Sequence, residues 1–229
     1  LYACQLFLAF AISFQTKAQT VELAADINPT GSSFANNTFS YNGEIILSAA
    51  LQQFNRELIG FDGSTAYLIE EINPGTASSS PGSFTEFNNK VYFFATQAAT
   101  GRELWSYDGS SVQIEYESVP GTSDNFSSGI LTVFNGELYF LMDDGNIGSE
   151  LYKYDGTNTP TLVADLNTTA GQGSNVSMFT HFNNELYFLA TDANDITEIW
   201  HYDGTNAPSK ATDSNFPSNN TFSNIVELN

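Results

Sequence analysis

Short apolar segments, each bounded by turn-forming residues, follow one another along the chain from residue 21 onward. Within residues 67–112 these segments are 67–72, 83–87, 90–96 and 103–107, and Pro-Gly, Asn-Asn and Asp-Gly pairs mark the turns. Runs of this length between turn signals predict β-strands. Gly and Asn interrupt every window that could carry the 3.6-residue apolar spacing of a helix. The sequence therefore predicts an all-β protein.

One sequence unit recurs along the chain. An aromatic residue followed by Asp-Gly occurs four times, at steps of 46, 47 and 48 residues. Five residues before each aspartate stands a glutamate, and an aromatic-Asn turn keeps the same register at 41–43, 87–89, 134–136 and 182–184. The repeated residues are Glu57, Asp62 and Gly63; Glu103, Trp105, Asp108 and Gly109; Glu150, Asp155 and Gly156; and Glu198, Trp200, Asp203 and Gly204.

These marks in a common register predict tandem units at 21–66, 67–112, 113–159 and 160–207, with a truncated fifth unit at 208–229. The third segment of the later units is apolar at every position, as in 91–95, 138–142 and 186–190. A strand that is apolar on both faces lies inside a stack of sheets. We therefore expect an incomplete β-propeller-like array of four-stranded antiparallel blades, about four and a half repeats long. A two-sheet sandwich would alternate more cleanly, and a β-solenoid would have shorter coils.

Residues 101–109 (Gly-Arg-Glu-Leu-Trp-Ser-Tyr-Asp-Gly) resemble the signature of the ELWxxDGT-repeat proteins. Residues 150–157 and 198–205 repeat it with Tyr152 and Ile199 as departures, and unit 21–66 matches least well. This family consists of secreted, Bacteroidetes-type bacterial proteins with propeller-like repeats, often exported by type IX secretion. The resemblance implies export and residence at the cell surface or outside the cell. It also leads us to expect a fragment of a larger exported protein.

The N-terminal residues independently suggest export. The uncharged apolar run 6–14 is followed by Thr16 and Ala18, small residues suited to signal-peptidase cleavage. We expect residues 1–18 to be a signal peptide, incomplete at its start because it lacks an initiator methionine, and 19–229 to be the repeat domain. The alternative is a buried first strand or helix. No later segment is apolar enough to cross a membrane, so we expect no membrane insertion after cleavage.

The charge balance restricts the kinds of partner that the chain can bind. Six Lys and Arg stand against 26 Asp and Glu, a formal net charge of −20. Such a surface repels nucleic acid, so nucleic-acid binding is excluded as a main function. The single cysteine, Cys4, allows neither a disulfide framework nor a thiolate zinc site. An extracellular protein or glycan is the expected partner.

The repeated acids are expected to serve the fold. A catalytic pair needs two carboxyl groups in different environments, whereas repetition gives each copy nearly the same one. We predict that the Asp-Gly pairs form turns in which the carboxylate accepts backbone N–H groups, and that the glutamates hydrogen-bond at strand ends. The two histidines, His181 and His201, replace other residues at their repeat positions and are interpreted as surface substitutions. The aromatics at 105, 152 and 200 are expected to pack between blades.

Two inter-strand loops are richer in oxygen ligands, which suit calcium. The candidate ligands are Asp143, Asp144, Asn146, Asp192, Asn194 and Asp195. Neither loop follows the EF-hand pattern, and a solvated hairpin loop is the alternative. No other cofactor is expected.

The sequence favours a non-catalytic secreted or cell-surface scaffold that binds protein or glycan, and it assigns no catalytic residue. The alternative is a propeller enzyme, a hydrolase or lyase acting on extracellular polysaccharide. Its active residues would lie in missing units or in unit-specific loops, with Asp143, Asp144, Asp192 and Asp195 as first candidates. A last sheet lacking strands would also leave an edge open to pairing with another chain.

Overall fold

The computed structural model describes residues 26–51, 55–121, 124, 126 and 130–211. In these ranges the chain forms four sheets of four antiparallel strands and no helix, in agreement with the all-β prediction. No helix long and apolar enough to span a bilayer occurs in the described ranges. The predicted signal segment 1–18 lies outside them.

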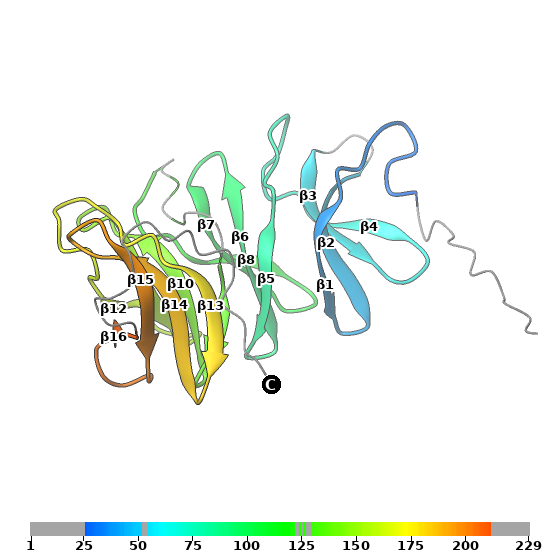
Figure 1. Cartoon of the computed structure of the whole chain (residues 1–229). Coiled ribbons are helices and arrows are strands. Elements are labelled where there is room, and N and C mark those ends of the chain that lie inside the picture. The colour runs from blue at the N-terminus through cyan, green and yellow to red at the C-terminus, as the bar shows by residue number, and fades with distance from the viewer. Residues whose placement is uncertain (1–25, 52–54, 122–123, 125, 127–129, 212–229) are drawn as a thin grey trace, which may run out of the picture.

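Each sheet is a simple meander whose strand order follows the chain (Figure 1). The first sheet contains β1 (Asn36–Tyr41), β2 (Glu44–Ala50), β3 (Arg56–Phe61) and β4 (Ala66–Glu70). The second contains β5 (Gly82–Phe87), β6 (Lys90–Gln97), β7 (Gly101–Tyr107) and β8 (Val112–Tyr116). The third contains β9 (Thr132–Phe134), β10 (Glu137–Asp143), β11 (Ser149–Tyr154) and β12 (Thr161–Ala164), and the fourth β13 (Ser177–Phe182), β14 (Glu185–Thr191), β15 (Thr197–Tyr202) and β16 (Ser209–Lys210).

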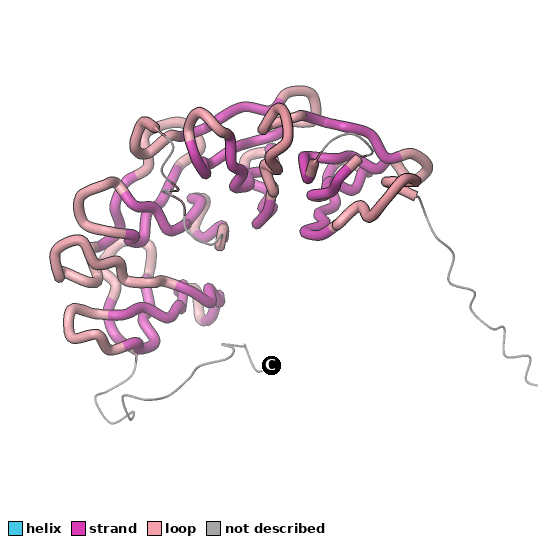
Figure 2. Tube along the Cα trace, turned by 90° about the horizontal axis from the view of Figure 1, so that it is seen from above, coloured by secondary structure: helices cyan, strands magenta, loops and turns pink. Residues whose placement is uncertain are grey.

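The sheets follow one another around an open arc, as the view from above shows (Figure 2). The first strands of consecutive sheets contact each other, β1 with β5 and β5 with β9. These strands therefore line the inner side of the arc. The described sheets do not close into a ring.

The sheets are out of phase with the sequence units by one strand. We expected each Asp-Gly turn to lead into the next unit, but the strand that follows it belongs to the same sheet: Tyr67 pairs with Gly60, and Gln113 with Ser106. The reason is that a tight turn can join only antiparallel neighbours. The passage to the next sheet instead uses a longer crossover, such as residues 71–81. Likewise β16, placed in the fifth unit by sequence, completes the fourth sheet, and 212–229 lie outside the described residues.

The hydrophobic core lies between neighbouring sheets. One cluster joins Tyr41, Ile46 and Leu58 of the first sheet to Phe93 and Trp105 of the second, and similar clusters join the second to the third and the third to the fourth. Residues 91–95 of β6 are all buried, as the apolar pattern predicted. Tyr152 and Trp200 also pack in these clusters, so the expected packing of the aromatics between sheets is confirmed.

Candidate binding site at the rim of the third and fourth sheets

The meander brings two of the repeated marks to the same end of each sheet. The aromatic-Asn turn joins the first and second strands, and the Asp-Gly turn joins the third and fourth. Across each sheet interface the Asn side chain of one sheet reaches the Asp-Gly turn of the next. Asn88 Nδ2 donates to Asp155 O at 3.3 Å, and Asn135 Nδ2 donates to Asp203 O at 3.3 Å. We call this contact the rim clasp.

The Asp-Gly turns have the local geometry predicted from sequence. Asp62 Oδ1 accepts the backbone N–H groups of Ser64 and Thr65, both at 2.8 Å. Asp108, Asp155 and Asp203 repeat the pattern. These hydrogen bonds favour the ionised carboxylate and lower the pKa of each aspartate. The carboxylates are therefore occupied in shaping turns.

The glycine of the turn is required by the clasp as well as by its φ. Gly156 has φ of +87°, and a Cβ there would come within 2.8 Å of Asn88 Nδ2. At Gly204 the corresponding approach of Asn135 Nδ2 is 2.5 Å. Gly63 has a similar φ but nothing within 4 Å, because no described sheet precedes it. Sequence reasoning found both marks but not that they meet.

The repeated glutamates lie at the opposite end of the sheets, where Glu57 and Glu150 accept N–H groups of the crossovers. Glu57 is 1% exposed, and its carboxylate accepts the N–H groups of Ile72 at 2.9 Å, Asn73 at 3.3 Å and Ser79 at 3.1 Å. The Ser79 hydroxyl donates to it as well, at 2.5 Å. Burial raises the pKa of Glu57, and these hydrogen bonds oppose the rise. We call this arrangement the carboxylate cradle; for Glu57 it agrees with the predicted hydrogen bonding at strand ends.

The cradle varies between copies. Glu150 accepts the Leu166 N–H at 3.0 Å, and burial again raises its pKa. Glu198 pairs with Lys210. Glu103, 0% exposed, has no hydrogen-bonding partner for either carboxylate oxygen among the described residues. Burial, with the nearby negative charge of Glu117, raises its pKa to about 8.

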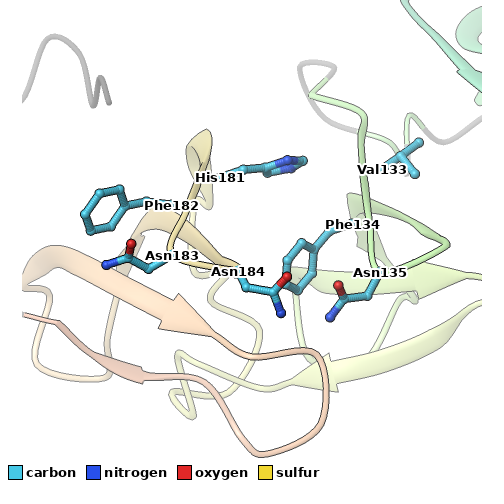
Figure 3. A pocket seen from close by; sticks show the side chains of 7 residues that line it. All are labelled: Val133, Phe134, Asn135, His181, Phe182, Asn183 and Asn184. Carbon is cyan, nitrogen blue, oxygen red and sulfur yellow. The ribbon is translucent and has the colours of Figure 1, made fainter. Parts of the chain in front are cut away.

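A hollow of about 420 Å³ opens at the rim between the third and fourth sheets (Figure 3). The aromatic-Asn turns of the two sheets form its walls. His181 and Asn184 point across it toward the third sheet, whereas Phe182 points away. The lining residues are Val133, Phe134, Asn135, His181, Phe182, Asn183 and Asn184. None of them carries a carboxylate or an ammonium group.

The imidazole of His181 is held from the third-sheet side. Its Nε2 lies 3.2 Å from Thr132 Oγ1, and its ring centroid lies 5.7 Å from that of Phe134. At the first interface Tyr41 donates its hydroxyl to Asn89 O at 2.6 Å, whereas Phe134, in the register of Tyr41, has no hydroxyl to donate. Sequence analysis treated His181 as a surface substitution and missed this hollow. Comparing the aromatic-Asn turns copy by copy would have shown the missing hydroxyl.

The calcium candidates of each loop hydrogen-bond with the backbone of their own loop. In the loop between β10 and β11, Asp143 accepts the Gly145 N–H at 2.8 Å and Asp144 accepts the Asn146 N–H at 2.9 Å. Among the described residues no three His, Cys, Asp or Glu side chains are arranged to hold a metal ion. The loop alternative fits this half of the prediction.

In the loop between β14 and β15, Asp192 accepts the N–H groups of Asn194 and Ile196 and pairs with Lys210 at 2.7 Å. Burial by itself would raise the pKa of Asp192, but the Lys210 ammonium and these N–H groups outweigh the effect of burial and lower the pKa to about 2. Asp192 and Asp195 line a hollow of about 290 Å³ with Asn167, Thr169, Gln172 and Ala193. Its buried acid is already neutralised by an ion pair.

His201 lies in a row of polar side chains across the fourth sheet. Its Nδ1 is 2.9 Å from Glu185 Oε2, and its Nε2 is 2.8 Å from Ser209 Oγ. These distances suit a nucleophile, a base and an orienting acid. At the same positions of the third sheet, Glu137 and Lys153 form an ion pair at 2.9 Å. These positions therefore hold a pair of interacting polar side chains on adjacent strands in both sheets.

No protein-family model matches the sequence, and comparison with curated proteins finds no match. Solved structures do resemble the fold. The β-propeller domain of the trilobed protease from Pyrococcus furiosus, described as having an open velcro topology, gives a TM-score of 0.54 at 15% identity, over 80% of this chain and 56% of that one.

Two peptidase structures are similar to a comparable degree. Pyrococcus horikoshii acylaminoacyl peptidase gives 0.52 at 14% identity, over 79% of this chain and 27% of that one. A structure from work on two prolyl endopeptidases gives a TM-score of 0.51 at 11% sequence identity, over 78% of this chain and 26% of that one. The chain thus spans about half of the first structure and about a quarter of the other two. At these identities the similarity establishes the fold alone: the four described sheets are blades of a β-propeller whose ring is not closed.

Proposed function

We propose that this chain is a non-catalytic binding scaffold that holds a neutral glycan in the hollow between the third and fourth sheets. The observation that carries the proposal is the lining of that hollow. It presents amides and an imidazole over an apolar floor and no charged side chain, although the whole chain has a net charge of −20.

The chemistry of these groups fits hydroxyl-rich ligands. Amides both donate and accept hydrogen bonds, as sugar hydroxyls do. The acidic surface repels anions, and a cation would find its carboxylates elsewhere. A volume of about 420 Å³ suits a small ligand such as one or two sugar residues better than a folded protein surface. An extracellular protein, the other partner expected from the sequence, therefore fits this hollow less well.

The proposed setting is the cell surface or the extracellular space. The apolar run at 6–14 and the resemblance of 101–109 to the ELWxxDGT repeats support export. In that setting the propeller would present its rim to extracellular glycans. The test of setting is fractionation of cells that express the chain, followed by N-terminal sequencing of the exported form.

Binding is tested on a glycan array, followed by titration calorimetry of the best ligand with residues 19–229. Asn184→Gly and His181→Val introduce the residues that Gly136 and Val133 place in the same register of the third sheet. We expect each to weaken binding by at least about tenfold, or about 1.4 kcal/mol. Asn89→Gly, the same change in the second sheet, should leave affinity unaltered. Equal affinity in all variants, or cleavage of the glycan, contradicts the proposal.

A further inference from the structure

A second hollow lies at the crossover end of the sheets, opposite the rim. Its walls are the crossover from β12 to β13 and the loop between β14 and β15, and its volume is about 290 Å³. We call it the crossover hollow; it is lined by Asn167, Thr169, Gln172, Asp192, Ala193 and Asp195. We propose that it binds a small ligand that carries a protonated primary amine among hydroxyl groups, that is, an amino sugar.

The first crossover shows how such a crossover can be joined to the loop of the following sheet. There Asn73 Oδ1 accepts the Ala98 N–H at 3.1 Å, and Gln97 Nε2 donates to Ile72 O at 3.2 Å. These two hydrogen bonds tie the side chain of each segment to the backbone of the other. They use the amides that would otherwise be available to a ligand.

In the crossover hollow the side chains in the registers of those two residues have other partners. Asn167 Oδ1 accepts the Thr169 N–H of its own crossover at 3.2 Å. Asp192 binds its own loop and pairs with Lys210 at 2.7 Å. One side-chain contact between the walls is made by the Thr169 hydroxyl, which donates to Ala193 O at 3.4 Å. Space between the two segments is thus lined by polar groups.

The crossover wall is fixed by backbone contacts on both sides. Gly148 of the third sheet lies so close to it that a Cβ there would come within 2.7 Å of Gln172 C. The Ser174 N–H donates to Ser149 O at 3.0 Å, and the Thr191 N–H donates to Ser174 O at 2.7 Å. The crossover is therefore held between the third and fourth sheets, and the hollow is pre-formed, as small-ligand sites usually are.

The charge of the hollow indicates a cationic ligand. Asp192, 8% exposed, is balanced by the Lys210 ammonium. The exposed Asp195 also lines the hollow, and its carboxylate accepts no hydrogen bond from any described residue. One negative charge thus stands uncompensated beside the amide of Gln172 and the hydroxyl of Thr169. A ligand that supplies one positive charge and several hydroxyl groups matches this lining.

The same lining selects a primary amine over other cations. A primary ammonium brings three N–H donors to a carboxylate and amide oxygens. Calcium requires six to eight oxygen ligands, and no three His, Cys, Asp or Glu side chains in the described ranges are arranged to hold a metal ion. A quaternary ammonium is recognised by aromatic faces. The lining residues of this hollow include no aromatic side chain.

The test compares two sugars that differ in the charge of one group. The full chain is titrated with glucosamine and with N-acetylglucosamine at about pH 6, where the free amine is protonated, and amide NMR shifts are followed. We expect glucosamine to bind about fivefold more tightly, the effect of one partly exposed ion pair, with shifts at 167–172 and 192–195. Butylamine, an amine without hydroxyl groups, should bind more weakly than glucosamine.

The position of the shifts separates this inference from the proposed function. Glucosamine shifts confined to 133–135 and 181–184 would place the amino sugar in the rim hollow and overturn the inference, while leaving neutral-glycan binding at the rim intact. Butylamine binding as tightly as glucosamine would also overturn it, because the hydroxyl groups would then contribute nothing. Absence of glucosamine binding at the crossover hollow has the same consequence.

Three variants test the roles of the lining. Asp195→Asn removes the charge and suits the φ of +61° at this position, so it should abolish the preference for glucosamine over N-acetylglucosamine. Gln172→Ala should weaken both sugars alike, by about threefold. Glu86→Gln removes an exposed carboxylate on β5 and is the matched control for net charge; it should change neither affinity. Thermal melts establish that each variant is folded. A preference that survives Asp195→Asn, or one that Glu86→Gln reduces equally, overturns the proposal.

Discussion

Glu57 and Glu103 occupy the same position in consecutive sheets, yet their surroundings differ. Both are buried, at 1% and 0% exposed. Glu57 accepts three backbone N–H groups and the Ser79 hydroxyl, whereas neither carboxylate oxygen of Glu103 has a hydrogen-bonding partner in the described part of the chain. The residue eight positions before the aromatic-Asn turn also differs: it is Ser79 in one crossover and Phe126 in the next.

The comparison shows that repetition preserved the buried carboxyl group but not its hydrogen bonds. The ring of Phe126 packs at centroid distances of 5.2 Å from that of Phe94 and 5.7 Å from that of Phe140. At this position the crossover of the second sheet thus has an aromatic ring in place of the hydroxyl of Ser79. Burial and the negative charges of Glu117 and Asp124 raise the pKa of Glu103 to about 8. At neutral pH this carboxyl is mostly protonated, and a neutral group is far less costly to bury.

The largest effect is expected from removing the satisfied carboxylate. Glu57→Ala leaves the Ile72, Asn73 and Ser79 N–H groups buried without an acceptor, at about 4 kcal/mol in total. Glu103→Ala removes a side chain on which no described hydrogen bond depends and whose raised pKa lowers stability at neutral pH, so it should cost much less. Urea denaturation at neutral pH measures both. Equal losses would show that the two cradles do not differ in function.

The second effect tests the exchange of a hydroxyl for a ring. Phe126→Ser removes a fully buried ring, which costs about 4 kcal/mol, and restores a donor worth about 1 kcal/mol to Glu103. We expect a net loss of about 3 kcal/mol together with a lower pKa of Glu103. Thermal and urea unfolding give the first, and carbon-13 NMR titration of the carboxyl gives the second. Phe126→Ala is the control: it should lose more stability and leave the pKa raised by comparison.

The third expected effect concerns how the free energy of unfolding changes with pH. With a folded pKa of about 8 and an ordinary value of 4.5, Glu103 keeps its proton in the folded state while the unfolded chain releases it. Stability therefore falls as pH rises from 4.5 to 8, by about 1.4 kcal/mol per pH unit from this group, and then levels off. Glu103→Gln should flatten this part of the profile relative to wild type. An unchanged slope would place the ionised carboxylate in the folded protein.

Local features of this structure were predictable from sequence, and features formed between sheets were not. The Asp-Gly turn depends on residues within three positions of Asp62, so its geometry could be predicted. The strand after it could be assigned to the wrong sheet because only the pairing of Tyr67 with Gly60 determines the phase. The acids of the β10–β11 loop looked like ligands by spacing alone, but their own backbone satisfies them.

The candidate site needed information that no single repeat contains. His181 and Asn184 come from one sheet, and Phe134 and Asn135 from another, so the hollow appears only when two turns are placed side by side. The difference between the cradles has the same origin. Glu103 looks identical to Glu57 in the sequence signature, but its raised pKa depends on burial and on the nearby charges of Glu117 and Asp124, which lie outside that signature.

The smallest effect is expected from removing the hydroxyl donor of Glu57 without adding an aromatic ring in its place. Ser79→Ala removes the hydroxyl that donates to Glu57 but keeps the three backbone N–H donors. We expect a loss of about 1 kcal/mol at neutral pH, since one hydrogen bond to a carboxylate is removed and a small void remains. The pKa of Glu57, already raised by burial, should rise further because the Ser79 hydroxyl, whose hydrogen bond opposes the rise most strongly, is gone. Urea denaturation at several pH values would then show a loss that grows as the pH rises from the folded-state pKa of Glu57 in the wild type to its higher value in the variant. Ser78→Ala is the control: Ser78 lies next to Ser79 in the same crossover, but its hydroxyl accepts the Arg56 N–H, so its loss should not grow with pH.

A pH-independent loss in Ser79→Ala would contradict the prediction. It would mean that the backbone donors alone set the charge of the Glu57 carboxylate.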